Sequence, residues 1–185
     1  MLIVDVQNDF CPGGSLAVKE GDQVVPVLNR YIEKFTKAGA PIFATRDWHP
    51  ERSRHFINGG GQWPVHCVRE TEGGKFHPGL ALGSDVVIVS KGASPDADSY
   101  SGFEAIDTAG IKLADLLRQA GVKRLFIGGL ATDYCVKHTV LDALQYGFEV
   151  VLLEDAIRGV DLTVGDSARA IEEMVRAGAH KRSAS

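Results

Sequence analysis

Cys135 is the residue whose type and position most favour chemistry in this sequence. It follows an apolar segment that ends in Gly128-Gly129, and a stretch with helical spacing begins beside it. We expect Cys135 in the first turn of that helix, with Thr132 or Asp133 as the N-cap. Unpaired N–H groups and the helix dipole lower the pKa of a thiol there and can stabilise an oxyanion. A cysteine inside a helix is more often an inert buried residue, so its position is what favours a nucleophile.

Asp5 and Lys91 end two other apolar segments. An unpaired carboxylate at the end of a buried strand is costly, so one interpretation pairs Asp5 with backbone N–H groups or with Arg46. Lys91 by itself is typical of a solvated surface residue. Considered together, Lys91 can hold Asp5 and a thiolate in place, while Asp5 carries a proton from the thiol to a leaving amine. With Cys135, these two residues predict an amidase that uses a cysteine nucleophile.

A second group of residues has the types that bind metal ions. Asp47, His49, His55 and His66 follow the spacing D-x-H-x5-H-x10-H. Imidazole and carboxylate ligands suit one divalent ion such as zinc, iron or manganese. Four protein ligands would make a closed structural site, which Cys67 beside His66 could complete, whereas open positions would make a functional one. The sequence leaves this choice, and the identity of the metal, open.

Five short segments rich in β-branched residues must position these side chains. They are residues 2–6, 41–45, 85–90, 124–128 and 149–154. Their continuous apolarity is typical of strands that are covered on both faces. Amphipathic stretches lie between most of them, namely residues 24–35, 113–117 and 136–144.

This alternation predicts an α/β fold, a three-layer α/β/α sandwich around a parallel sheet of five to six strands. We expect one domain over residues 1–185. Residues 46–84 and 91–106 show no period, and long irregular loops in a compact domain are usually functional or disordered. The first of these loops holds four of the six histidines, which favours function. Because ligands bind beyond the carboxyl ends of parallel strands, the reactive residues should converge at one edge of the sheet.

The composition excludes several other classes of protein. The chain has 185 residues, of which 44% are hydrophobic and 24% charged, and a net charge of −4. We expect no nucleic-acid partner, because no basic stripe is present to neutralise phosphates, and no membrane partner, because no apolar run approaches the length of a membrane span. Three cysteines do not make a disulfide framework, so the expected location is the reducing cytoplasm. The sequence does not decide whether the chain forms a homo-oligomer.

Six segments of the chain carry recognisable motifs. They are LIVDVQNDFCPGGSL at 2–16, TRDWHP at 45–50, WPVHC at 63–67, KG at 91–92, YSGF at 100–103 and GLATDYCV at 129–136. In this order they resemble the nicotinamidases (pyrazinamidases) of the isochorismatase-like cysteine hydrolase superfamily, and the resemblance extends over residues 2–177. It implies hydrolysis of nicotinamide to nicotinate and ammonia for NAD salvage, with pyrazinamide as a further substrate.

The resemblance also implies a role for each site residue. The implied catalytic triad is Asp5, Lys91 and Cys135. The implied metal ligands are Asp47, His49 and His66, with His55 as a further ligand or close neighbour. The implied oxyanion hole is the N–H groups of Ala131 and Cys135, beside a cis peptide between Leu130 and Ala131. The implied substrate pocket is formed by Phe10, Trp63, Leu130 and Tyr100, where the metal would bind the pyridine nitrogen.

One departure from the family and two alternative functions remain. The family sheet gains a sixth strand after the last helix, but residues 178–185 are polar and unlike a strand, so either this edge strand is short or the chain ends early. A related isochorismatase-like hydrolase without metal, acting on another small amide, is one alternative, which the histidines disfavour. A non-catalytic metal-binding or thiol-sensing module is the other, and it leaves Asp5 and Lys91 unexplained.

Overall fold

Six parallel strands form one sheet, whose spatial order is β3-β2-β1-β4-β5-β6. The structure, a computed structural model, describes residues 1–96 and 98–183. The strands are β1 (Leu2–Val4), β2 (Phe43–Asp47), β3 (Val87–Lys91), β4 (Arg124–Leu130), β5 (Glu149–Arg158) and β6 (His180–Arg182). The predicted parallel sheet of five to six strands is confirmed.

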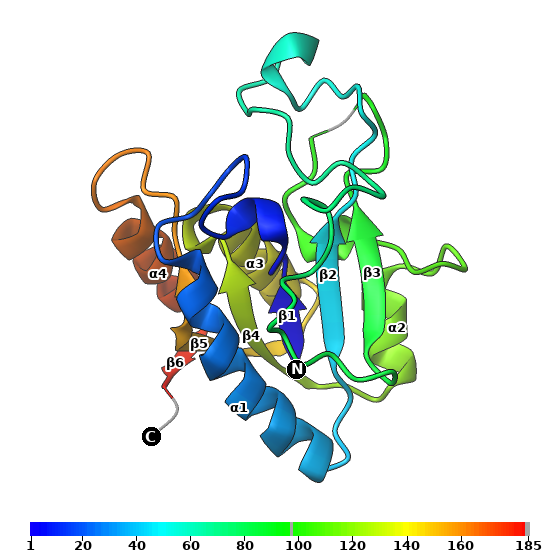
Figure 1. Cartoon of the computed structure of the whole chain (residues 1–185). Coiled ribbons are helices and arrows are strands. Elements are labelled where there is room, and N and C mark those ends of the chain that lie inside the picture. Colours follow the sequence, from blue (N-terminus) through cyan, green and yellow to red (C-terminus); the bar gives the residue numbers. More distant parts are fainter. Residues whose placement is uncertain (97, 184–185) are drawn as a thin grey trace.

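Helices cover both faces of the sheet, which gives the three predicted layers (Figure 1). They are α1 (Val24–Lys37), α2 (Leu113–Gln119), α3 (Lys137–Gln145) and α4 (Asp166–Arg176). α1 packs into one buried apolar cluster with Ile3, while the other helices pack into a second cluster with Leu2 and Val4. Successive side chains of β1 therefore enter the two opposite cores, which explains its continuous apolarity. Within the described residues, no helix has the length and apolar character needed to cross a membrane.

The polar tail of the chain forms the sixth strand. His180, Lys181 and Arg182 of β6 pair with residues of β5, and all three side chains are exposed. An edge strand has one side and often one face in water, so charged residues are tolerated there and discourage further strand pairing. The short edge strand is therefore the alternative that the fold adopts.

The direction in which the chain adds strands to the sheet reverses between β1 and β4. The chain adds β2 and then β3 on one side of β1, and it adds β5 and then β6 on the far side of β4. A crevice forms at such a switch point because the loops leave the two central strands in opposite directions. Asp5 directly follows β1, and Cys135 follows β4 by five residues. The fold thus places a carboxylate and a thiol on either side of the crevice.

The two irregular segments extend from the same end of the sheet, above the tips of β2 and β3 (Figure 1). Residues 48–86 connect these strands without an α-helix and contain only a single short 3-10 turn, Ile57–Gly59. Residues 92–112, after β3, contain one more, Gly102–Glu104. For the described residues of these two regions, the predicted absence of long regular elements is confirmed.

We predict that Gly129→Ala destabilises the sheet at the switch point. Gly129 has φ +131°, and an added Cβ would overlap the carbonyl oxygen of Val4, its partner in β1. The strained backbone alone should cost about 1–3 kcal/mol, and the overlap adds to it. Gly39→Ala is the matched control, because Gly39 also has a positive φ but open space around it. Urea unfolding of both variants checks the prediction, and equal losses of stability would contradict it.

Candidate active site

The Lys91 side chain is fully buried at the end of β3 and lies among three of the predicted site residues. Its Nζ lies 3.0 Å from Oδ2 of Asp5 and forms an ion pair with Oδ1 of Asp47. It also lies 3.5 Å from Sγ of Cys135 and 3.4 Å from the carbonyl oxygen of Ser99. The structure therefore brings together Lys91, at the end of β3, with Asp5 and Cys135 from the segments that follow β1 and β4. A buried ammonium group requires such compensation by charge and hydrogen bonds.

The charges in this cluster shift the pKa values of its members in different directions. Burial alone would lower the pKa of Lys91, but the charges of Asp47 and Asp5 outweigh it, so this pKa lies well above its usual value. Burial alone would raise the pKa of Asp47, but the charge of Lys91 outweighs it, so this carboxylate stays ionised. For Asp5, burial outweighs the opposing charge of Lys91 and raises the pKa. A carboxylate of raised pKa suits proton transfer.

Asp5 is held by Thr45 of the neighbouring strand β2. The Thr45 hydroxyl donates a hydrogen bond to Oδ1 of Asp5 at 2.6 Å, while Oδ2 faces Lys91. Asp5 has φ +48°, a conformation that is uncommon for non-glycine residues. Arg46 is not its partner, because Arg46 donates to Ser90 and stacks over the ring of Trp48. The interpretation of Asp5 as a structural partner of Arg46 is therefore wrong.

Cys135 lies in a π-helical turn, Thr132–Val136, that precedes α3. The N-cap is Ala131, and neither Thr132 nor Asp133 caps the turn through its side chain, so the predicted cap is wrong. Asp133 fails to cap because its carboxylate accepts hydrogen bonds from another loop. Burial raises the pKa of the Cys135 thiol well above its usual value, although the charge of Lys91 opposes this. The resting thiol is thus protonated, and the predicted lowering of its pKa is wrong.

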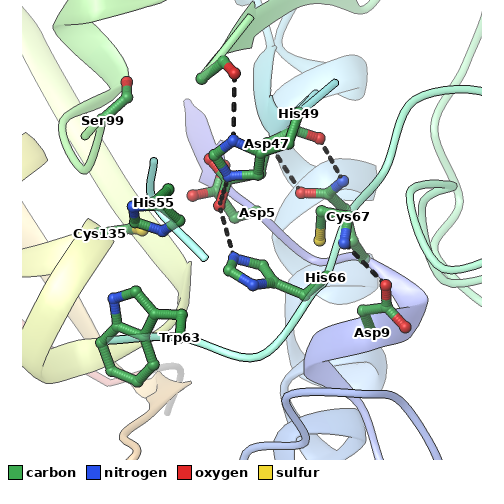
Figure 2. A network of polar contacts seen from close by, with 12 residues as sticks. Asp5, Asp9, Asp47, His49, His55, Trp63, His66, Cys67, Ser99 and Cys135 are labelled. Atoms are coloured by element: carbon green, nitrogen blue, oxygen red, sulfur yellow. Dashed lines mark hydrogen bonds and ion pairs between the residues drawn. The ribbon is translucent and has the colours of Figure 1, made fainter. Parts of the chain in front are cut away.

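The rings of His49, His55 and His66 gather beside Asp47 (Figure 2). Each Nδ1 has an oxygen partner: the carbonyl of Gly92 for His49 at 3.1 Å, Asp98 for His55 at 2.6 Å, and the carbonyl of Pro64 for His66 at 2.8 Å. An Nδ1–H donated to oxygen leaves the Nε2 lone pair for a metal ion. Burial lowers the pKa of His66 to about 4 and that of His55 below its usual value, so both rings are neutral near pH 7.

These residues fit a divalent metal ion. One ring nitrogen from each histidine lies within 4.8 Å of the others. Oδ2 of Asp47 lies 3.7 Å from Nε2 of His49 and 3.9 Å from Nε2 of His66. Nε2 of His49 is buried without a hydrogen-bond partner, a cost that a bound ion would remove. Cys67 belongs to neither group of potential ligands among the described residues.

Backbone contacts fix the positions of Asp47 and His49. The Gln7 side chain forms hydrogen bonds with both backbone groups of Asp47. Its Nε2 donates to the Asp47 carbonyl and its Oε1 accepts from the Asp47 N–H, each at 2.8 Å. Gly92 has φ +69°, and a Cβ there would collide with the His49 ring. Reasoning from the sequence missed Gln7, whose position just after β1 was the one available signal.

A pocket opens beside the thiol. Its lining is formed by Phe10, Leu16, Asp47, Trp63, His66, Tyr100, Ala131, Tyr134, Cys135 and Val160. Three of the four expected pocket residues line it, while Leu130 lies behind the wall in the core cluster that includes Phe10. Trp63 Nε1 donates to the Tyr100 hydroxyl at 3.0 Å, and Tyr134 packs edge-on against Trp63. Leu16, Tyr134 and Val160 were missed, and of these only Tyr134, beside Cys135, carried a signal in the sequence.

The peptide bond between Leu130 and Ala131, beside the thiol, is cis, as expected. The Ala131 carbonyl accepts hydrogen bonds from the N–H groups of Tyr134 and Val136. In the described part of the chain, the Ala131 N–H itself donates to no other group. This N–H is therefore available to a ligand in the pocket.

The fold and this site define the class of protein. Residues 1–184 match the model of the isochorismatase domain, so the chain belongs to the isochorismatase family. It is an isochorismatase-family enzyme whose relatives include nicotinamidases.

Three relatives illustrate the similarity. The chain is 43% identical to the nicotinamidase of Escherichia coli (strain K12), over 97% of this chain and 92% of the relative. It is 50% identical to the pyrazinamidase of Pyrococcus horikoshii, solved in complex with zinc, with a TM-score of 0.92 and coverage of 99% and 97%. It is 36% identical to PnC1 from L. infantum, solved in complex with nicotinate, with a TM-score of 0.83 and coverage of 98% and 90%.

We predict that iodoacetamide modifies Cys135 before the other two cysteines. Cys135 lines the pocket beside Lys91 and is 7% exposed, whereas Cys11 is 3% and Cys67 0% exposed. A difference in rate of about 10-fold or more is expected, because the reagent reaches Cys135 through the pocket and the Lys91 ammonium group stabilises the thiolate that reacts. Peptide mapping by mass spectrometry at successive times measures it. Faster labelling of Cys11 or Cys67 would contradict the assignment.

Proposed function

We propose that this chain is a nicotinamidase, which hydrolyses nicotinamide to nicotinate and ammonia in NAD salvage and also accepts pyrazinamide. The observation that carries the proposal is one buried cluster centred on Lys91. The Lys91 ammonium group contacts the thiol of Cys135, the carboxylate of Asp5 and the carboxylate of Asp47, which is also a potential metal ligand. The named activities of the nicotinamidase and pyrazinamidase relatives support it. A thiol, a proton acceptor and a pocket lined by aromatic rings are what hydrolysis of an aromatic amide requires.

The first half of the reaction forms a thioester. The carboxylate of Asp5 and Sγ of Cys135 lie within 4.8 Å of each other. Asp5 accepts the thiol proton while the sulfur attacks the carboxamide carbon. The N–H groups of Ala131 and Cys135 donate to the oxyanion that develops. Asp5 then gives the proton to the departing nitrogen, the C–N bond breaks and ammonia leaves.

The second half restores the enzyme. Asp5 takes a proton from a water molecule whose oxygen attacks the thioester carbon, and the C–S bond breaks. The proton returns from Asp5 to the sulfur, and nicotinate is released. Throughout, Lys91 keeps Asp5 in place and balances the negative charge that moves between the carboxylate and the sulfur.

The substrate ring occupies the pocket between Phe10, Trp63 and Tyr100, with Leu130 supporting the wall from behind. Asp47, His49, His66 and His55 would hold a divalent ion, zinc, iron or manganese, at one end of this pocket. A bound ion would supply a ligand position for the pyridine nitrogen, which orients the carboxamide toward the thiol. The zinc bound by the pyrazinamidase relative supports this arrangement.

We predict that purified protein releases ammonia from nicotinamide and that Cys135→Ala lowers kcat by more than about 10³-fold without unfolding the chain. Lys91→Ala and Asp5→Asn should each cost nearly as much, because members of one catalytic unit are not additive. Lys91→Arg should not restore activity, since a guanidinium group differs in shape. An ammonia assay with circular dichroism as the folding control measures this. Substantial activity in Cys135→Ala would exclude the proposed nucleophile.

We predict that the bound metal creates a preference for nicotinamide over benzamide, which carries the same amide but lacks the ring nitrogen, and that removal of the metal reduces this preference. With metal, nicotinamide should be preferred by roughly 10²-fold or more in kcat/KM, because a buried site built for a polar partner loses a few kcal/mol without it. His49→Ala should lower the bound metal and raise KM, whereas His77→Ala, outside the cluster, serves as control. Elemental analysis and kinetics with and without chelator test this. Equal rates on both amides in the native enzyme would show that the histidines only stabilise the fold.

A further inference from the structure

One wall of the pocket comes from a loop that no motif marks, residues 159–165 between β5 and α4. Val160 of this loop lines the pocket together with Cys135 and Trp63. Figure 1 shows the loop, in orange, extending from the same end of the sheet as the other loops of the site. Beyond Val160 the loop is exposed, with Leu162 at 65% and Val164 at 93% of their possible surface. A loop this exposed needs specific contacts to keep Val160 in the wall.

Asp133 supplies those contacts from the turn that carries the nucleophile. Its carboxylate accepts a hydrogen bond from the Val160 N–H at 2.9 Å and another from the Asp161 N–H at 2.8 Å. Asp133 is 6% exposed, and hydrogen bonds to a buried, charged acceptor are among the stronger ones in proteins. Because Asp133 precedes Cys135 by two residues in one π-helical turn, it fixes Val160 relative to the sulfur.

Hydrogen bonds connect the other side of this loop to α4. Asp161 accepts hydrogen bonds from the N–H and the hydroxyl of Ser167, each at 2.8 Å, and adopts φ +50°. A side chain at Gly159 would collide with the Ser167 hydroxyl, so the loop closes tightly onto the helix. Only the two bonds to Asp133 join this loop to the turn of Cys135 through side chains among the described residues.

We propose that Asp133 is a positioning residue that holds Val160 against the substrate ring and thereby limits the pocket to small, unsubstituted rings. The inference rests on the proposed amidase function and adds a determinant of its selectivity. Asp133→Asn is the sharp test, because an amide keeps the size of the side chain but offers one oxygen acceptor for two N–H donors. One N–H then faces an NH₂ group, and the loop loses a fixed position.

Kinetics with nicotinamide and with its ring-methylated analogues measures the effect. Asp133→Asn should raise KM for nicotinamide by about 10-fold with little change in kcat. It should also raise the kcat/KM of at least one methylated analogue, relative to that of nicotinamide, by about 10-fold. One methyl group changes kcat/KM in an apolar pocket by about this factor. Val160→Ala should reproduce this change, and the double variant should add little to either single one. Asp142→Asn, which removes a charge from α3 without removing a hydrogen bond, is the control.

Hydrogen exchange gives a readout that does not depend on activity. The amides of Val160 and Asp161 should exchange more slowly in the wild type than in Asp133→Asn, while exchange in the central strands stays unchanged. Equal exchange would overturn the proposed contact. A uniform loss of kcat on every substrate, with KM and selectivity unchanged, would show that Asp133 only stabilises the fold. Absence of ammonia release by the wild type would refute the amidase function, and the selectivity role with it, while the exchange data would still decide whether Asp133 holds the loop.

Discussion

The buried ammonium group of Lys91 is the interaction on which the site depends. Removing it would leave Asp5 and Asp47 as two carboxylates in the protein interior without a counter-charge, and such a cost is several kcal/mol per ion. Asp47 turns one oxygen to Lys91 and the other toward His49 and His66. The same carboxylate therefore belongs to both the thiol cluster and the metal-type cluster. A change in the charge of either cluster therefore affects the other cluster through the carboxylate of Asp47.

The sheet makes this arrangement possible because three of its strands end at the same height. Asp47 and Lys91 are paired residues at the ends of β2 and β3, while Asp5 follows β1, the strand next to β2. Adjacent parallel strands lie about 4.8 Å apart, so side chains that leave paired positions on one face come within ion-pair distance. Rigid strands thus fix the charges, and the loops supply the groups that recognise a ligand, a common division of roles in α/β proteins.

This division explains what the sequence could and could not reveal. Asp5 and Lys91 end apolar segments and Cys135 follows another, so the rule that ligands bind at the carboxyl ends of strands was sufficient to bring them together. Val160 and Leu16 are ordinary apolar residues in loops, and nothing in their type distinguishes a pocket wall from a core. The partners of Asp133 lie 27 and 28 residues away in sequence, so its local signal was that of an N-cap. The pKa of Cys135 was misjudged because burial, which depends on the whole fold, outweighs the nearby turn and Lys91.

A protonated resting thiol changes how the reactivity of Cys135 is understood. A permanent thiolate in an accessible pocket is open to alkylation and oxidation at all times. Here burial keeps the proton on the sulfur, and burial also raises the pKa of the adjacent Asp5. A carboxylate whose pKa is raised is a stronger base than an ordinary carboxylate, so Asp5 is better suited to accept the proton of the thiol. In the proposed reaction, the nucleophile is then formed only when a carbonyl lies in the pocket to receive the electrons of the sulfur.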